Sequence, residues 1–191
     1  MNRRQRKLVS LAVAVLALVL SLLGQHFGWF NQPVEQIRQS NPGLYSVTHF
    51  SDGDTITVDM NGQSEKVRMI GVDTPETHDP DVPVQCYGPA ASAYTQNLIG
   101  NQKVRLEADP TNQNRDRYGR LLRYVYLADG RLVQEKILRN GYGFAYTLFP
   151  FTKKTEFISL EGEARAANKG LWGNCTVVEE PGGRKQTNPV D

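Results

Sequence analysis

The sequence predicts an α+β protein whose centre is a small five-stranded β-barrel. Short segments rich in Val, Ile, Thr and Tyr alternate with turn signals, and apolar residues recur at helical spacing between and after them. The predicted strands span residues 44–51, 54–60, 63–70, 103–108 and 121–127. At 191 residues the chain is long enough for one ordinary domain with its own hydrophobic core.

The first three strands are expected to form an antiparallel meander. Asp52-Gly53 separates the first strand from the second, and Asn61-Gly62 separates the second from the third. Both dipeptides are turn signals, and Asn-Gly is favoured in two-residue hairpins because both of its residues tolerate positive φ. The chain therefore reverses direction twice within its first three strands.

Three helices accompany the strands. Pro89 can occupy the first turn of a helix that Gly100 ends, residues 132–140 form a second helix, and a longer third helix lies at about 157–170. The predicted order is βββ-α-ββ-α-α. A meander with so few strands must close or be covered to bury its apolar face, and a partly open five-stranded barrel of the OB-fold type does this.

The first thirty residues differ from the rest of the chain. Four basic residues precede an apolar run at 8–23, which is typical of an export signal: Arg3, Arg4, Arg6 and Lys7. The run is long enough to favour a retained transmembrane anchor at 1–30. Trp29 and Phe30 would then lie at the membrane–water interface opposite the basic cluster. The alternative is a cleaved signal peptide. We expect a catalytic or binding domain outside the cytoplasm, attached to the cell membrane or secreted.

The remaining chain divides into three parts by composition. Residues 31–43 are polar and contain two prolines, so we expect a linker. Residues 44–176 are the predicted domain. Residues 177–191 offer little apolar surface, and we expect a disordered tail.

Charge limits the kind of nucleic-acid site that the chain could have, and the cysteine positions predict a cross-link. Four of the 22 basic residues lie in the leader, so the remaining 18 face 20 acidic residues and give a net charge of −2. Any nucleic-acid site must therefore be local, because the exported part is not globally basic. Cys86 and Cys175 both follow the leader, and we expect them to form a disulfide, with two free thiols as the alternative.

Three short motifs carry candidate chemistry: Asp52-Gly53-Asp54-Thr55, then 68–76 (RMIGVDTPE), and 116–120 (DRYGR). The first alone is typical of a turn, and the second adds carboxylates at a strand end. Two carboxylates, a carbonyl and waters suit a hard cation such as Ca²⁺ or Mg²⁺. The chain has no C-x-x-C pair, and its three histidines, at 26, 49 and 78, are scattered, so a soft-metal site is not predicted.

The third motif interleaves arginine with tyrosine. Its residues could form a solvated basic loop, but beside a metal the guanidinium groups could bind phosphate and a ring could stack on a base: Arg115, Arg117, Tyr118, Arg120, Arg123 and Tyr124.

The three motifs, taken in order and separation, resemble the staphylococcal nuclease (thermonuclease) family over about residues 47–172. Tyr87-Gly88-Pro89 and Gly170-Leu171-Trp172 belong to the same resemblance. It implies the five-stranded OB-fold barrel of that family and a nuclease that hydrolyses phosphodiester bonds of single-stranded DNA and RNA and leaves 3′-phosphates.

The resemblance also implies roles for single residues. One Ca²⁺ would be held by the carboxylates of Asp54 and Asp73 and the backbone carbonyl of Thr74, with Asp52 and Thr55 in support. Such a cation and fixed guanidinium groups would stabilise the charge that phosphodiester attack builds on phosphoryl oxygens.

Further residues match positions that act on the substrate. Glu76 matches the general base, and Arg68 and Arg120 match the phosphate-binding pair. Tyr118 and Tyr146 match positions that contact the nucleotide, and Arg117 lies beside the first of them. Leu148 stands where the family often has a second tyrosine, which leaves base preference open.

Two other functions compete with catalysis. Relatives that keep the barrel as a protein- or RNA-binding module have typically lost the acidic residues and arginines, whereas this chain fills all of these positions. A surface scaffold with structural calcium would leave Glu76 and Arg120 without a purpose. The sequence therefore favours the nuclease.

Overall fold

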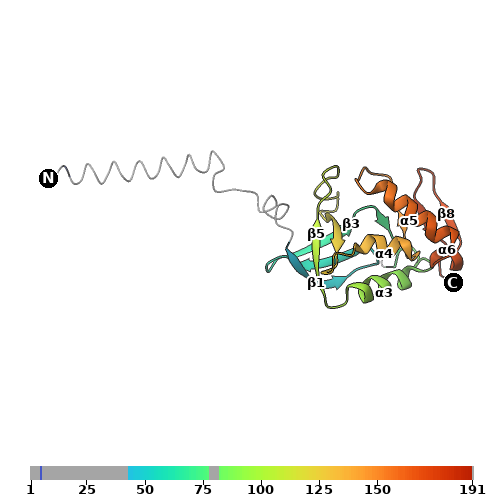
Figure 1. Ribbon diagram of the computed structural model, residues 1–191, viewed down its shortest axis with the longest axis horizontal. Helices are drawn as coiled ribbons and strands as arrows, with labels where there is room; N and C mark the ends of the chain where they lie inside the picture. The colour runs from blue at the N-terminus through green and yellow to red at the C-terminus, as the bar shows by residue number, and fades with distance from the viewer. Residues whose placement is uncertain (1–4, 6–42, 78–81, 191) are drawn as a thin grey trace. The chain divides into compact units, whose positions relative to one another are not determined.

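The computed structural model describes Gln5 and residues 43–77 and 82–190 (Figure 1). The predicted anchor and linker, except for Gln5 and Gly43, lie outside the described residues, as does His78. Among the residues that are described, no helix is both long enough and apolar enough to cross a membrane.

Five strands close into a barrel in the order β1-β2-β3-β6-β5. All neighbours are antiparallel except β3 and β6, which run parallel. The predicted five-stranded barrel is therefore confirmed, with strand ends within one residue of the prediction. The strands are β1 (Leu44–Phe50), β2 (Thr55–Asp59), β3 (Ser64–Met69), β5 (Lys103–Glu107) and β6 (Leu121–Tyr126).

The Asn-Gly turn between β2 and β3 has the predicted geometry. Asn61 and Gly62 adopt φ of 58° and 84°, as a type I′ hairpin requires at both central residues. The Asp59 carboxylate accepts a hydrogen bond from the Gly62 N–H at 2.6 Å. This tight turn fixes the register in which Thr55 pairs with Arg68 at the opposite end of the two strands.

A second, two-stranded sheet was not predicted. β4 (Val72–Asp73) pairs with β7 (Phe144–Ala145), so that Asp73 lies opposite Phe144. Strands of two residues are too short to give a period-two pattern in the sequence. Their pairing joins the end of the meander to a segment more than 70 residues later in the chain.

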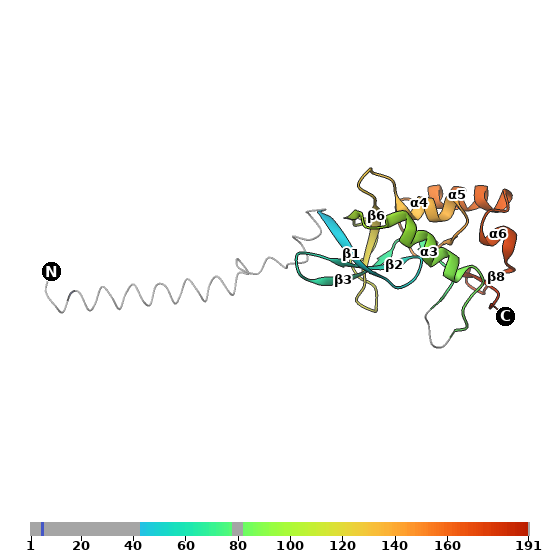
Figure 2. The ribbon, with the colours of Figure 1, turned by 90° about the horizontal axis from the view of Figure 1, so that it is seen from below.

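Four helices are described: α3 (Gly88–Ile99), α4 (Val133–Arg139), α5 (Lys154–Ala166) and α6 (Leu171–Asn174). In Figures 1 and 2, α4 lies between α3 and α5, and it contacts both helices. The predicted third helix begins three residues earlier than expected and is followed, after Gly170 at a φ of 57°, by the separate short α6.

Helix α4 is attached to the barrel by a buried glutamine. The Gln134 side chain is fully buried, donates from Nε2 to the carbonyl of Arg123 at 2.9 Å and accepts from the N–H of Val125 at 3.1 Å. Both partners belong to β6. Around this contact the core is apolar, with Ile56 and Val67 fully buried inside the barrel, so burial of hydrophobic surface supplies most of the stabilisation.

The loop after β5 is tied to the start of α5 through Asp109. Its buried carboxylate accepts hydrogen bonds from the hydroxyl groups of Thr111, Tyr124 and Thr152 at 2.6, 2.6 and 2.7 Å. Burial alone raises the pKa of Asp109, but these hydrogen bonds outweigh it and hold the pKa well below the ordinary value. Burial and the hydrogen bond that its hydroxyl donates to Asp109 raise the pKa of Tyr124.

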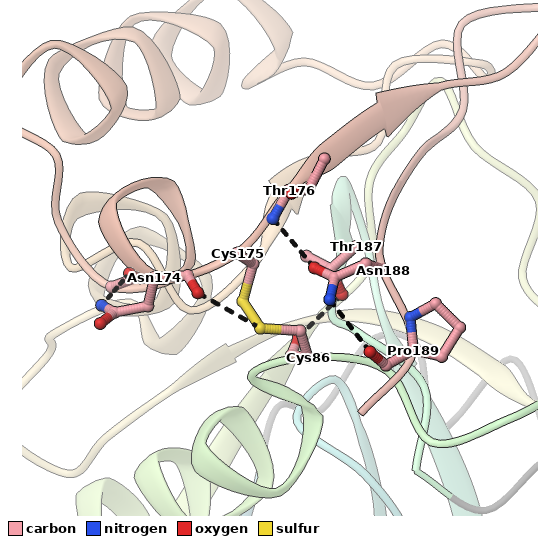
Figure 3. Close-up of a disulfide and its surroundings, with 8 residues drawn as sticks. Cys86, Asn174, Cys175, Thr176, Thr187, Asn188 and Pro189 are labelled. Carbon is pink, nitrogen blue, oxygen red and sulfur yellow. Dashed lines mark hydrogen bonds between the residues drawn. A yellow bond between two sulfur atoms is a disulfide. The ribbon is translucent and has the colours of Figure 1, made fainter. Parts of the chain in front are cut away.

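Cys86 and Cys175 form a disulfide, as predicted (Figure 3). Their Cα atoms are 5.9 Å apart, within the usual range, although the residues are separated by 89 positions in the sequence. The disulfide joins the segment just before α3 to the segment just after α6.

The C-terminal tail is ordered, so the prediction of a disordered segment from Val177 onward was wrong. β8 (Val177–Glu179) and β9 (Lys185–Thr187) form an antiparallel hairpin, and Thr187 is buried. The composition of the tail gave no sign of this because its order comes from tertiary contacts. The disulfide at Cys175 fixes one end, and the Thr187 hydroxyl donates to the carbonyl of Cys86 at 2.7 Å (Figure 3).

Candidate active site

The site is built around Asp54, in the loop between β1 and β2. The N–H of Asp54 donates to Oδ1 of Asp52 at 3.1 Å, and its carbonyl accepts from the N–H of Met69 at 2.9 Å. The first bond shapes the loop from within, and the second fastens it to the end of β3. Asp54 is consequently held with only 3% of its surface exposed.

Both oxygens of the Asp54 carboxylate have partners. Oδ2 accepts hydrogen bonds from the N–H of Thr74 at 2.7 Å and from its hydroxyl at 3.1 Å. Oδ1 accepts from the hydroxyl of Thr55 at 3.0 Å and is ion-paired with Arg68. The first two motifs of the sequence therefore meet, as their predicted chemistry requires.

Gly53 allows the loop that carries Asp54 to lie close to Thr74. A Cβ atom at residue 53 would lie 2.8 Å from Cγ2 of Thr74 and 3.0 Å from its Oγ1. The carbonyl of Gly53 also accepts a 2.6 Å hydrogen bond from the hydroxyl of Thr95 on α3. Gly53 does not adopt a positive φ, so the glycine of the motif is needed for close packing between the two loops rather than for the turn.

Arg68 lies between two carboxylates. Its Nη2 donates to Oδ1 of Asp73 at 2.5 Å, and its guanidinium also pairs with Asp54. Only 13% of the Arg68 side chain is exposed, and Asp73 is 8% exposed. Charges this deeply buried must be paired, so the three side chains form one electrostatic unit.

The other oxygen of Asp73 faces a residue that the sequence did not suggest. Arg184, in the turn of the C-terminal hairpin, places its Nε 3.4 Å from Oδ2 of Asp73. The charge of Asp73 raises the pKa of the Arg184 guanidinium against the opposing effect of burial. The two residues are 111 positions apart, and no local pattern in the tail marks Arg184.

Glu76 follows Asp73 by three residues, in the loop that leads to α3. It is partly buried, and its Oε1 accepts from the N–H of Thr77 at 2.8 Å. Gln85 holds the backbone of Glu76 from both sides, accepting from its N–H at 3.0 Å and donating to its carbonyl at 2.9 Å. Gln85 therefore positions Glu76, a role that the sequence gave no means of recognising.

Arg120 directly precedes β6, the strand that pairs with β3 and therefore lies next to Arg68. The parallel pairing of β3 with β6 places Leu121 opposite Val67 and Leu122 opposite Arg68, so Arg120 immediately precedes the paired segment. Asp116 holds Arg120 by a 2.7 Å bond to its Nε and a 2.9 Å bond to its N–H. Burial raises the pKa of Asp116, but the bonds and charge of Arg120 outweigh it, and the pKa is lowered.

Tyr118 stands at the tip of the same turn and is 68% exposed. The guanidinium carbons of Arg117 and Arg120 lie 4.7 and 5.4 Å from the centre of its ring, which is cation–π distance. The three side chains form a surface of two cations and one aromatic ring just before the start of β6.

Three other members of the arginine–tyrosine pattern do not belong to this surface. Arg115 pairs with Glu65, and the buried Arg123 donates to Oδ1 of Asn114 at 2.6 Å. The ring of Tyr124 is buried, so it is not available to stack on a base. These side chains stabilise the loop through contacts with Glu65, Asn114 and Asp109, which only the folded chain makes and the interleaved sequence did not reveal.

Tyr146 directly follows β7, the strand that pairs with β4 and therefore with Asp73. Its N–H donates to the carbonyl of Gly71 at 2.9 Å, and its ring centre lies 6.0 Å from that of Phe149. Leu148 and Phe149 are both exposed. Phe149 therefore provides an aromatic ring close to the position where Leu148 departs from the family pattern.

Comparison with known proteins agrees with this geometry. A family model described as "Staphylococcal nuclease homologue" matches residues 66–174. The chain belongs to the staphylococcal nuclease family. The match covers Arg68, Asp73 and Glu76 as well as the turn that carries Arg120.

Several members of the family are similar over most of this chain. A thermonuclease of Staphylococcus hyicus is 43% identical over 139 residues, which are 72% of this chain and 80% of the relative. A thermonuclease of Staphylococcus intermedius is 38% identical over 161 residues, 84% of this chain and 91% of the relative. Endonuclease YncB of Bacillus subtilis is 43% identical over 133 residues, 69% of this chain and 62% of the relative.

Proposed function

We propose that this member of the staphylococcal nuclease family is an exported, calcium-dependent nuclease. Its substrates would be single-stranded DNA and RNA, cut at phosphodiester bonds to leave 3′-phosphate ends. The observation that carries the proposal is the buried unit of Asp54, Arg68 and Asp73, with Arg120 just before the adjacent strand β6. Buried carboxylates beside guanidinium groups are the groups that phosphodiester hydrolysis uses.

The donor set fits a hard cation. Asp54 and Asp73 would supply carboxylate oxygens, and Thr74, whose N–H donates to Asp54, would supply its backbone carbonyl. Within the described residues no group of three or more His, Cys, Asp or Glu side chains is placed to hold a metal. A cation here would complete its coordination with other oxygens, and Ca²⁺ commonly uses carbonyls and waters in this way.

Each charged residue of the site has a separate role in the proposed reaction. Arg68 and Arg120 would bind the phosphate and stabilise the charge that develops on it. Glu76, fixed by Gln85, would accept a proton from the attacking water. When bound, the cation would polarise a phosphoryl oxygen.

Cleavage of denatured DNA by the full-length protein tests the proposal. We expect cutting with Ca²⁺ and none with a chelator. Glu76→Gln and Arg120→Ala should each lower kcat by about a hundredfold or more, the usual cost of losing one group that acts in the transition state. Arg131→Ala is the matched control, because Arg131 is exposed and pairs with Asp129 within its own turn.

Two outcomes would contradict the proposal. A folded protein that binds Ca²⁺ but leaves DNA and RNA intact would be a binding module of the same fold. Retained cleavage in both Glu76→Gln and Arg120→Ala would remove the assigned roles. Phosphatase sensitivity of the 3′ ends tests the product, and protease accessibility in intact cells tests export.

A further inference from the structure

The C-terminal hairpin is attached to the domain at several points. The disulfide Cys86–Cys175 precedes β8, and the N–H of Cys86 donates to the carbonyl of Asn188 after β9 at 2.7 Å (Figure 3). On β9, Nζ of Lys185 donates to Glu161 of α5 at 2.6 Å. The other oxygen of Glu161 accepts from the N–H of Ala145 in β7 at 3.1 Å. The hairpin is therefore fixed to α5 and, through it, to the small sheet that carries Asp73.

The turn of the hairpin presents Arg184 to the site. The N–H of Glu180 donates to the carbonyl of Arg184 at 2.7 Å, and the N–H of Gly183 donates back to the carbonyl of Glu180 at 2.9 Å. These bonds define a tight turn that ends at Arg184. Its side chain then reaches Asp73, with 3.4 Å between Nε and Oδ2.

Asp73 thus has a guanidinium group on each oxygen. Arg68 contacts Oδ1 and is 13% exposed, whereas Arg184 contacts Oδ2 and is 54% exposed. Arg68 is consequently the deep cation and Arg184 the outer one. A guanidinium has five N–H donors, and the contact of Arg184 with Asp73 is made through Nε, so its exposed side chain can offer the terminal nitrogens to a ligand.

The charge of the site shows what Arg184 adds. Asp54 and Asp73 with Arg68 alone carry a net charge of −1, which repels a phosphate. With Arg184 the same group is neutral. Arg184 therefore makes the site one unit charge less negative, which lowers the electrostatic repulsion of an anion at its edge before any cation contributes.

We propose that Arg184 is a third phosphate-binding arginine, carried to the active site by the C-terminal hairpin. This inference rests on the proposed function, because its ligand is a phosphate of the single-stranded substrate at the edge of the site. The hairpin then forms one wall of the site, and the disulfide is the fastening at its base.

Binding of a short fluorescent oligothymidylate to the full-length protein in the presence of a chelator tests this role without cleavage. Arg184→Gln, which keeps a polar side chain but loses the charge, should weaken binding about five- to tenfold at low salt. The slope of log affinity against log salt should become shallower by about 0.7, the value for one phosphate contact to a single strand.

Two further variants complete the test. Arg184→Lys should keep the salt slope, because the charge remains, and Arg131→Gln should behave as the wild type. Unchanged affinity and slope in Arg184→Gln, with tighter Ca²⁺ binding, would show that Arg184 only neutralises Asp73, and the inference would be overturned.

The failure of this inference is distinguishable from failure of the nuclease proposal. A wild-type protein that binds the oligonucleotide and cuts DNA with Ca²⁺, beside an Arg184→Gln variant that binds equally well, refutes the role of Arg184 alone. A wild-type protein that neither binds nor cuts refutes both. Loss of binding in Arg184→Gln, with a wild type that binds but does not cut, supports Arg184 as a phosphate ligand and refutes catalysis.

Discussion

Gly53→Ala is expected to damage the site from a position that contributes no functional group. The added methyl would lie 2.8 Å from Cγ2 and 3.0 Å from Cβ and Oγ1 of Thr74. Thr74 cannot rotate away without losing its 3.1 Å bond to Asp54, because β-branched side chains have few χ1 states. Overpacking of this kind typically costs about 1–3 kcal/mol of unfolding free energy.

Thermal unfolding and cleavage kinetics measure the effect together. For a domain of this size the melting temperature should fall by about 2–12 °C, and kcat/KM should fall at least about tenfold because Thr74 and Asp54 shift relative to the substrate. Gly162→Ala is the control: a Cβ in that exposed part of α5 meets nothing within 4 Å, and it should be neutral or stabilise by up to about 1 kcal/mol.

A second substitution refines the test. Thr74→Ser removes Cγ2 but keeps the hydroxyl, so the Gly53→Ala/Thr74→Ser double variant should recover part of both losses. If Gly53→Ala alone is as stable and as active as Gly162→Ala, then the two loops do not depend on close packing and the reasoning is refuted.

Three other predictions follow from the packing. Replacing Cys86 and Cys175 by Ser should remove up to about 4.6 kcal/mol, the chain-entropy value for their separation of 89 residues, and lower the melting temperature by about 9–18 °C; an unchanged melting temperature would contradict it. Asp109→Asn should cost at least about 2 kcal/mol at pH 7. Because the folded pKa of Asp109 is lowered, its contribution is complete above the ordinary pKa near 4 and declines as pH falls below it; urea unfolding from pH 7 to 3 should show the two proteins converging. Phe149→Ala should raise KM for single-stranded DNA about fivefold or more with little change in kcat, while Ile158→Ala, an exposed apolar residue on α5, should change neither.

The barrel could be predicted because its signals are local. Alternating apolar residues and the turn at Asn61-Gly62 lie within single strands and hairpins, so the sequence specifies them directly. The β4–β7 pairing and the C-terminal hairpin were missed for the opposite reason. Both are stabilised by residues far away in the chain, such as Glu161 for Lys185.

The same division applies to the site. Asp54, Asp73 and Arg120 lie in motifs whose residue types already indicate their chemistry, and the fold brings these motifs together. Arg184 and Gln85 carry no such motif. Their contacts with Asp73 and Glu76 exist only in the folded protein, so the sequence could indicate the proposed reacting groups but not the residues that contact them from distant parts of the chain.

The closed barrel also determines how neighbouring molecules meet. Each of its five strands is hydrogen-bonded on both sides, so its backbone groups are already used within one molecule. The strands of the two small sheets, β4–β7 and β8–β9, are only two or three residues long, and those of the hairpin carry Glu179 and Lys185. Short, charged edge strands resist pairing with a second sheet. Copies crowded along one strand of nucleic acid would therefore be protected from aggregation through their sheets at the high local concentrations that a polymeric substrate creates.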